Sequence, residues 1–389
     1  MALPLSYNVR NVIVRWKVTL LALGGISLVV AVLIALTAMA NGFSRALAVT
    51  GSSENAIVTQ RGSGSELSSG ISRSNVNMIM VDSRVKRDGQ GRPMASPEMV
   101  VVASLPKRGG DQTEVNVTVR GVTQMAFNVR QNVKIAQGRS FQPGLYELIV
   151  GEKAAERYQG LEVGGSITLQ RKTWNVVGVF TSEGSGFESE VWGDYDALAP
   201  VFNRSEGYQS LTLRLADPST LEAFDTEIRA NPSMQVQMAS ELAYYEGQAG
   251  QTAGTLTVLA IFVGIIMGIG AIFGAMNTMY ALVAARTREI GTLRALGFSR
   301  ASILASFMIE SAFLALVGGL LGSVLALPIN TLSGATAGAN FSQIAFDFSV
   351  SPQWLAIAVA SAVLMGLIGG FLPAFRAART PITAALRDV

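Results

Sequence analysis

Four acidic residues lie close together between positions 183 and 194 and are the first candidates for chemistry. They are Glu183, Glu188, Glu190 and Asp194, and two glycines, Gly184 and Gly186, lie among them. Carboxylate oxygens around a flexible turn are ligands that hard cations such as Ca²⁺ prefer. Their spacing fits no calcium-binding loop, however. We therefore favour a solvated acidic loop and predict no metal site.

The residue types needed for most other chemistry are absent from the sequence. The 389 residues include no cysteine and no histidine, which excludes disulfides, thiol catalysis, zinc sites of the usual kind and a lipid-modified cysteine. A Gly-rich phosphate loop with its lysine is also absent, so we expect no ATP site, no cofactor and no catalytic residue in this chain. If the protein uses ATP, a partner must bind the nucleotide and its Mg²⁺.

Glu310 is an acid inside an apolar stretch, some seven residues from its start, or about 10 Å along a helix. A carboxylate inside a membrane is unfavourable unless it is paired, and such acids are functional candidates. The alternative is a Glu that pairs with an arginine of the preceding basic segment. The sequence does not decide between these two interpretations.

That basic segment, residues 286–300, is the densest cluster of charge between two apolar runs. It contains Arg286, Arg288, Glu289, Arg294 and Arg300. Lys and Arg between two membrane spans normally stay in the cytoplasm. Apolar residues at spacings of three and four predict a short amphipathic helix at the membrane surface, which ends near Gly297 and is followed by a cap at Ser299. A plain charged connector is the alternative.

Composition and charge patterning predict a membrane protein with four spans. Hydrophobic residues make up 49% of the chain and charged residues 15%, which is too apolar for an ordinary soluble protein. The small net charge of +3 requires no nucleic-acid partner. Each predicted span exceeds the roughly 20 residues that cross a bilayer. We expect spans at residues 18–40, 255–284, 303–327 and 353–375.

The basic residues of the chain place both termini on the cytoplasmic side. Residues 1–17 form a basic N-terminal segment, residues 376–389 a basic tail, and residues 329–351 an extracytoplasmic loop. Residues 43–250 are more polar and contain most of the acids. We expect them to form an extracytoplasmic α+β domain, with strands at 55–59, 99–103, 115–119 and 211–215, helices at 152–158 and 221–230, and a mobile Gly/Ser-rich loop at 63–74.

The predicted spans also contain glycines at a spacing that allows close helix contact. Gly264 and Gly268, and again Gly270 and Gly274, repeat this small-xxx-small pattern. Packing between two copies and packing within one chain are both compatible with it, and we favour the contact between copies.

The run Arg288-Glu289-Ile290-Gly291-Thr292-Leu293-Arg294-Ala295-Leu296-Gly297 resembles the signature of the FtsX/MacB-like permeases, the four-helix membrane subunits of ABC transporters. Segments around Gly138-Arg139-Ser140-Phe141 and 174–180 resemble the outer domain of the same family, and residues 8–17 and 373–387 resemble its ends. Residues 380–384 depart from the usual acidic pattern of the tail, which weakens the expectation that the tail contacts an ATPase.

The resemblance implies a function and partners. It makes residues 286–297 a coupling helix that rests on a separate ABC ATPase, with the contact residues Arg286, Arg288, Glu289, Ile290, Gly291, Leu293, Arg294, Ala295, Leu296 and Gly297. It implies a dimer in the bacterial cytoplasmic membrane, with a second permease copy or paralogue and a periplasmic adaptor protein. ATP-driven movement of the outer domain would export or extract a substrate.

Three other functions fit the same sequence features. A lipoprotein-releasing permease and an FtsX-like mechanotransmission regulator of a cell-wall hydrolase share the architecture. From another class, the outer domain would be a ligand sensor that the helices merely anchor. The basic segment argues against the sensor, because a passive anchor does not require that sequence.

Overall fold

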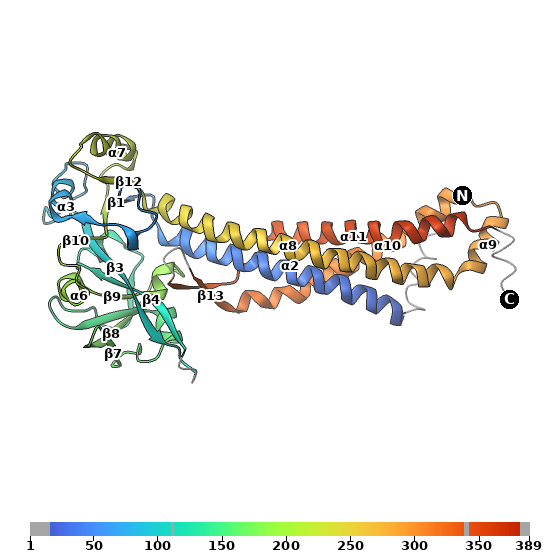
Figure 1. Ribbon diagram of the computed structural model, residues 1–389, viewed down its shortest axis with the longest axis horizontal. Coiled ribbons are helices and arrows are strands. Elements are labelled where there is room, and N and C mark those ends of the chain that lie inside the picture. Colours follow the sequence, from blue (N-terminus) through green and yellow to red (C-terminus); the bar gives the residue numbers. More distant parts are fainter. Residues whose placement is uncertain (1–15, 110–112, 338–341, 382–389) are drawn as a thin grey trace. The chain divides into compact units, whose positions relative to one another are not determined.

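The computed structural model describes residues 16–109, 113–337 and 342–381, and the chain divides into two units. The helical unit comprises Met1–Asn41, Thr255–Leu332 and Phe348–Val389. The inserted domain comprises Gly42–Gly254 and Ser333–Asp347. Figure 1 shows both units, coloured along the sequence. Residues 1–15 of the basic N-terminal segment and residues 382–389 of the tail lie outside the described residues.

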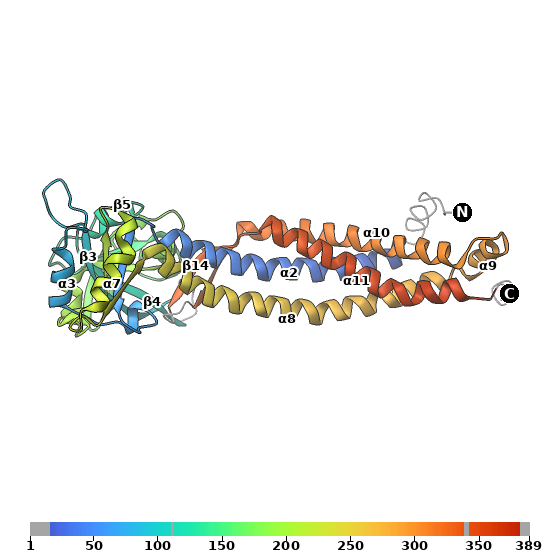
Figure 2. The same cartoon turned by 90° about the horizontal axis from the view of Figure 1, so that it is seen from above.

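Four long apolar helices form the helical unit, and two of them continue into the inserted domain. They are α2 (Trp16–Thr50), α8 (Glu241–Ala284), α10 (Arg300–Ala326) and α11 (Pro352–Arg379). Within the described part of the chain these are the helices long and apolar enough to cross a membrane. The short helix α9 (Thr287–Ala295) connects α8 to α10, and the 3₁₀ helix η4 (Leu327–Thr331) follows α10. Figure 2 shows the same helices from above.

Small residues bring the four helices close together. A Cβ atom at Gly322 would lie 2.5 Å from the Ser27 carbonyl oxygen of α2, and one at Gly366 of α11 would lie 2.3 Å from the Ala315 Cβ of α10. The Ser27 hydroxyl also donates to the Gly318 carbonyl at 2.9 Å. Close backbone contact therefore holds the helical unit together. This is expected in a membrane, because lipid tails are as apolar as the helices and hydrophobic burial does not favour contact between helices.

The glycines of α8 divide between two environments. Gly264 and Gly268 contact Leu33 and Met365 of the same chain, whereas nothing lies within 4 Å of the Cβ positions of Gly270 and Gly274. The first pair thus faces side chains of the same chain, as packing within one chain requires. The second pair lies on an open face of the helix.

The inserted domain is built on a ten-stranded mixed sheet with the order β12-β1-β11-β3-β4-β9-β6-β8-β5, and β7 pairs with β8. The strands of this sheet are β1 (Asn55–Gln60), β3 (Ala95–Pro106), β4 (Glu114–Val122), β5 (Lys134–Gly138), β6 (Glu147–Gly151), β7 (Ser166–Leu169), β8 (Lys172–Thr181), β9 (Val191–Asp194), β11 (Ser210–Arg214) and β12 (Val236–Ser240). A smaller sheet pairs β2 (Ile71–Ser72) with β10 (Gly207–Tyr208).

Short helices complete the domain. They are η1 (Glu66–Ser68), α3 (Arg73–Met80), α4 (Ala126–Val129), α5 (Glu152–Arg157), η2 (Gly186–Ser189), α6 (Tyr195–Val201), η3 (Pro218–Thr220) and α7 (Leu221–Ala230). The predicted α+β class of the domain and the four-helix membrane class of the chain are confirmed. The predicted mobile loop at 63–74 is wrong, because this segment forms η1, β2 and the start of α3, and Glu66 and Ile71 are buried.

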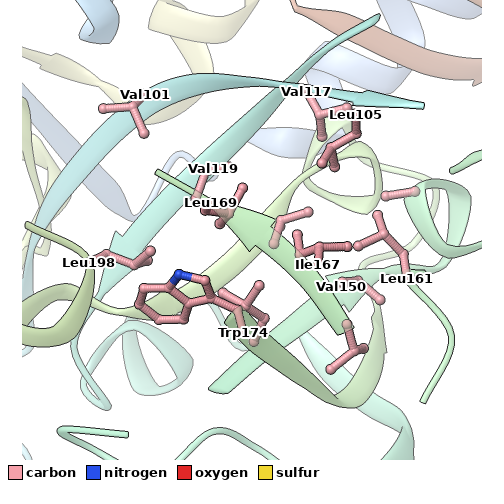
Figure 3. Packing of buried hydrophobic residues seen from close by; sticks show 14 of the residues in the cluster. Val101, Leu105, Val117, Val119, Val150, Leu161, Ile167, Leu169, Trp174 and Leu198 are labelled. Carbon is pink, nitrogen blue, oxygen red and sulfur yellow. The ribbon is translucent and has the colours of Figure 1, made fainter. Parts of the chain in front are cut away.

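Two hydrophobic cores stabilise the two halves of the large sheet. Figure 3 shows part of the larger core, where the fully buried Trp174 packs among aliphatic side chains such as Val119 and Leu198. A second core lies between β1, β11 and β12 and the helices α3 and α7, and it includes Phe224 and Ile228. We call these the β8 half and the β1 half of the domain. Strand β3 contributes to both cores.

The connection between α10 and α11 contributes a hairpin to the inserted domain. Its strands are β13 (Ser333–Ala337) and β14 (Gln343–Asp347), which pair in antiparallel register. The Ser189 hydroxyl accepts a hydrogen bond from the Ala345 amide at 2.8 Å, and the Thr118 and Ser342 hydroxyls lie 2.8 Å apart. Residues 333–347 are thus part of the domain rather than an independent loop.

Candidate functional site: the connector between α8 and α10

The connector helix α9 has well-defined ends that its own sequence provides. Gly297 adopts a φ of +95°, a conformation that favours glycine, and its amide donates to the Arg294 carbonyl at 3.2 Å. The Ser299 hydroxyl then accepts from the Ser302 amide at 3.1 Å and caps α10. The predicted stop at Gly297 and the predicted cap at Ser299 are both confirmed.

One face of α9 packs against its own chain. Ile290 is 3% exposed and lies in a hydrophobic cluster with Ile303 and Phe307 of α10 and with Ala377 of α11. The Arg294 guanidinium donates to the carbonyl of Ala378 at 2.9 Å. These contacts attach the connector to both α10 and α11.

The opposite face of α9 is open. Arg288, Glu289, Ala295, Leu296 and Gly297 are exposed, and Leu296 reaches 71% exposure. The ten residues predicted to contact an ATPase are therefore not equivalent in this structure. Arg286, Ile290 and Gly291 are buried, and Leu293 and Arg294 are partly buried. The exposed members are Arg288, Glu289, Ala295, Leu296 and Gly297.

Arg286 lies just before α9 and is buried rather than exposed. Its Nη1 donates to Glu310 Oε2 at 2.9 Å and its Nη2 donates to Glu310 Oε1 at 3.2 Å. Both side chains are at most 4% exposed, and the guanidinium also lies over the Phe307 ring at 5.9 Å. The structure thus favours the second interpretation of Glu310, a carboxylate paired with an arginine of the basic segment.

The acidic cluster at residues 183–194 is not the solvated loop that the sequence suggested. Glu188, Glu190 and Asp194 are buried, and each carboxylate accepts hydrogen bonds. Burial raises the pKa of Asp194, against the hydrogen bond from the Gly144 amide. These three acids belong to the folded domain, because Glu188 lies in η2, Asp194 ends β9, and Glu190 lies between the two elements. Within the described ranges, no group of three or more acidic side chains is arranged to hold a metal ion.

The sequence did not predict a set of buried charged side chains in the inserted domain. Arg120 and Arg130 are at most 2% exposed and are surrounded by glutamates from distant parts of the chain. One signal was present, an arginine inside the apolar strand Val117-Thr118-Val119-Arg120-Gly121-Val122. Its partners lie 22 to 70 residues away, so spacing does not reveal them.

Together these features define a class. The chain is a membrane protein whose four apolar helices carry an inserted α/β domain between the first two and an amphipathic connector between the second and third. Such an arrangement is that of a permease. Residues 19–231 match the model of the MacB-like periplasmic core domain, and residues 261–382 match that of the FtsX-like permease C-terminal region. The chain belongs to the FtsX/MacB-like family of ABC transporter permeases.

Individual relatives agree with this assignment. The macrolide export ATP-binding/permease protein MacB of Bordetella avium is 30% identical over 311 residues, which are 75% of this chain and 46% of that protein. The ABC transporter permease YknZ of Bacillus subtilis is 28% identical over 294 residues, 71% of each chain. The chain thus spans less than half the length of this MacB relative.

A solved structure was also matched. The periplasmic region of MacB from Actinobacillus actinomycetemcomitans matches 48% of this chain and 89% of that chain, with 12% identity and a TM-score of 0.36.

Proposed function

We propose that this chain is the permease subunit of a MacB-like ABC transporter in a bacterial cytoplasmic membrane. A separate ATPase would bind ATP and Mg²⁺, and its closure would push on α9. The inserted domain would lie outside the cytoplasm and act on a substrate there, with help from a periplasmic adaptor protein. This chain would contribute movement rather than catalysis.

The two-faced connector is the observation that carries the proposal. Ile290, Arg294 and the Arg286–Glu310 pair attach the connector region to α10 and α11. Arg288, Glu289 and Leu296 stay exposed. A push on the exposed face would therefore reach two membrane helices directly, because the buried face leaves little room for α9 to move alone.

The exposed face of α8 supports a dimer. Its exposed surface presents Val258, Phe262, Ile266, Gly270 and Gly274 at a regular spacing of four residues, so each lies next to the following one on the helix surface. Glycines in such a row allow a second helix to approach closely. We propose that a second permease copy, or a paralogue, packs there.

A site-specific cross-link tests the coupling role. The chain has no cysteine, so Leu296→Cys introduces a single reactive thiol on the open face of α9. A photoactivatable thiol reagent on this residue should attach an ABC ATPase subunit in membranes of the native host. The matched control is Lys172→Cys, an exposed position in the inserted domain. The absence of an ATPase adduct at residue 296, or equal adducts at both positions, would contradict the proposal.

A further inference from the structure

The inserted domain contains a cluster of six buried charged side chains, which we call the hub. Its members are Glu66, Glu98, Arg120, Arg130, Glu190 and Glu241. Each is at most 9% exposed. They come from η1, β3, β4, the residue after α4, the residue before β9 and the first turn of α8.

Arg120 connects the centre of the sheet to both halves of the domain. Its Nε and Nη2 donate to the two oxygens of Glu190 at 2.7 and 2.9 Å, beside β9 of the β8 half. Its Nη1 donates to Glu66 at 2.8 Å and to Glu98 of β3 at 2.9 Å. Glu66 also accepts from the hydroxyl of Ser210 on β11, in the β1 half, at 2.7 Å.

Arg130 connects this cluster to α8. Its Nε donates to Glu241, the first residue of α8, at 3.0 Å, while Nη1 donates to Glu98 and Nη2 to Thr212 of β11 at 2.8 Å. The Asn55 side-chain amide of β1 donates to the second oxygen of Glu241 at 2.9 Å.

A second residue of α8 completes the attachment. The Tyr245 hydroxyl donates to Glu66 at 3.2 Å, and its ring packs edge-on against Phe187 at 5.8 Å. The Arg130 guanidinium lies 4.7 Å from the centre of the same Phe187 ring. The first two turns of α8 are thus hydrogen-bonded to Asn55 of β1, to Arg130 and to Glu66, with the charges shielded from water. They reach the β8 half through the Phe187 ring and through Arg120, which joins Glu66 to Glu190.

Stability alone does not account for this arrangement. Buried ionic groups can often be replaced by apolar side chains without loss of stability, whereas removal of one partner is strongly unfavourable. Directional hydrogen bonds between charged groups instead fix the positions of the elements that they join. A slide of α8 along its axis would separate Glu241 from Arg130 and Asn55, and Tyr245 from Glu66, and would leave buried charges without partners.

We propose that the hub fixes the first turns of α8 to both halves of the sheet, so that a displacement of α8 carries the inserted domain with it as one body. Glu241, Arg130 and Arg120 are then positioning residues for the movement that the permease delivers. The inference rests on the proposed function for the source of that movement, but the attachment itself belongs to this chain.

Spin-label distances in the full-length protein test the attachment. One label goes on α8 at Gly250→Cys, where a Cβ atom would meet no neighbour within 4 Å. The other goes on Lys86→Cys beside the β1 half or on Thr173→Cys in β8, both exposed positions. The hub variants are Glu241→Ala and the milder Glu241→Gln. The matched control is Glu188→Gln, a buried carboxylate that accepts from the amides of Ser182 and Gly184 rather than from α8.

We expect one narrow distribution for each label pair in the unaltered hub and in Glu188→Gln, with no change when ATP is added to the purified complex. In Glu241→Ala both distributions should broaden without nucleotide and shift on ATP addition, and Glu241→Gln should show a smaller effect. Circular dichroism checks that the variants are folded. Narrow, unchanged distributions in a folded Glu241→Ala protein would overturn the proposal.

The two proposals can fail separately. A purified complex without an ATPase would contradict the proposed function, yet the nucleotide-free distributions would still decide whether the hub fixes α8. Conversely, ATP hydrolysis that depends on α9, together with unchanged distances in the hub variants, would leave the proposed function standing and remove the role of the hub.

Discussion

The pair of Arg286 and Glu310 shows how one side chain changes its interpretation once its partner is known. Glu310 alone in an apolar helix is a functional candidate, but two hydrogen bonds show that its carboxylate is paired with Arg286, which lies between α8 and α9. The sequence contained both residues, 24 positions apart. It could not show that Arg286 and Glu310 lie side by side, because the spacing of apolar residues does not determine how each helix is rotated about its own axis.

Removal of Glu310 should destabilise the helical unit. Glu310→Ala leaves the Arg286 charge buried without a partner, which costs about 3–5 kcal/mol, so the melting temperature of the detergent-solubilised protein should fall. The double variant Arg286→Met with Glu310→Met should recover much of the loss, because no lone charge remains. Equal melting temperatures for the single and the double variant would contradict the pairing.

The surroundings of Glu66 predict that the stability of the inserted domain depends on pH. Burial by itself raises the pKa of Glu66, but the attraction of Arg120 and the hydrogen bonds from Arg120 and Ser210 outweigh it and hold the pKa below its ordinary value. A carboxyl with a lowered pKa contributes stability above its unfolded pKa of about 4.3, and this contribution is lost as the pH falls through the folded value. Stability should therefore decline below about pH 4.

Glu66→Gln isolates this contribution. Fluorescence of the buried Trp174 and Trp192 reports unfolding of the domain over a series of pH values. The variant should be less stable than the unaltered protein at neutral pH, and the difference between the two should shrink in acid. A difference that stays constant between neutral pH and pH values below about 4 would contradict the assignment.

At the scale of elements, α9 was predicted well because its signals are local. Its end at Gly297, the cap at Ser299 and its amphipathic pattern are all written within fifteen consecutive residues. The helix at 221–230 could also be predicted from local signals, since Pro218 and Pro232 flank it. Helix α7 has the same bounds. The pattern did not show which residues of α9 point inward, because that depends on α10 and α11.

The two faces of α9 should respond differently to truncation. Ile290→Ala removes a buried side chain and should cost about 2–5 kcal/mol of stability, whereas Leu296→Ala, at an exposed position on the same helix, should leave the melting temperature unchanged. In a co-purification assay, Leu296→Ala should instead weaken retention of the ATPase. Loss of stability in Leu296→Ala alone would reverse the assignment of the two faces.

The hairpin β13–β14 shows the limit of topology reasoning. Residues 329–351 were expected to form an extracytoplasmic loop, and the expectation included no contact with the inserted domain. The hydrogen bond between Ala345 and Ser189 shows that the hairpin packs within that domain. A hydrogen bond between residues 156 positions apart leaves no local trace in the sequence.

A disulfide can test this contact. The Thr118 and Ser342 hydroxyls lie 2.8 Å apart, so the cysteines of Thr118→Cys with Ser342→Cys should be close enough to bond. Because the chain has no other cysteine, mild oxidation should give one intramolecular cross-link, identifiable by mass spectrometry after proteolysis. Thr118→Cys with Leu332→Cys, outside the hairpin, is the control. Failure of the first pair to react would argue against the docked hairpin.

For the whole molecule, the class and the family followed from features that the sequence repeats or concentrates: four apolar runs, one basic connector and a polar insertion. The hub did not, because Glu66, Arg120 and Glu241 are far apart in the chain, and of these three only Arg120, inside an apolar strand, gives a local signal. In the folded domain these side chains are buried together in one cluster. The acids at 183–194 illustrate the same difficulty, since their hydrogen-bond donors Arg120 and Gly144 lie outside the cluster.

We propose that α9 couples this permease to a separate ATPase, and co-purification of the two proteins is the test of this role. The intact chain is purified in mild detergent from its native membrane, and ATP hydrolysis and bound proteins are measured. We expect an ABC ATPase to co-purify with the unaltered chain and the preparation to hydrolyse ATP. Glu289→Lys should lose both the bound ATPase and the hydrolysis, whereas Glu162→Lys in the inserted domain should retain both. An ATPase that stays bound and active in Glu289→Lys, or none with the unaltered chain, would contradict it.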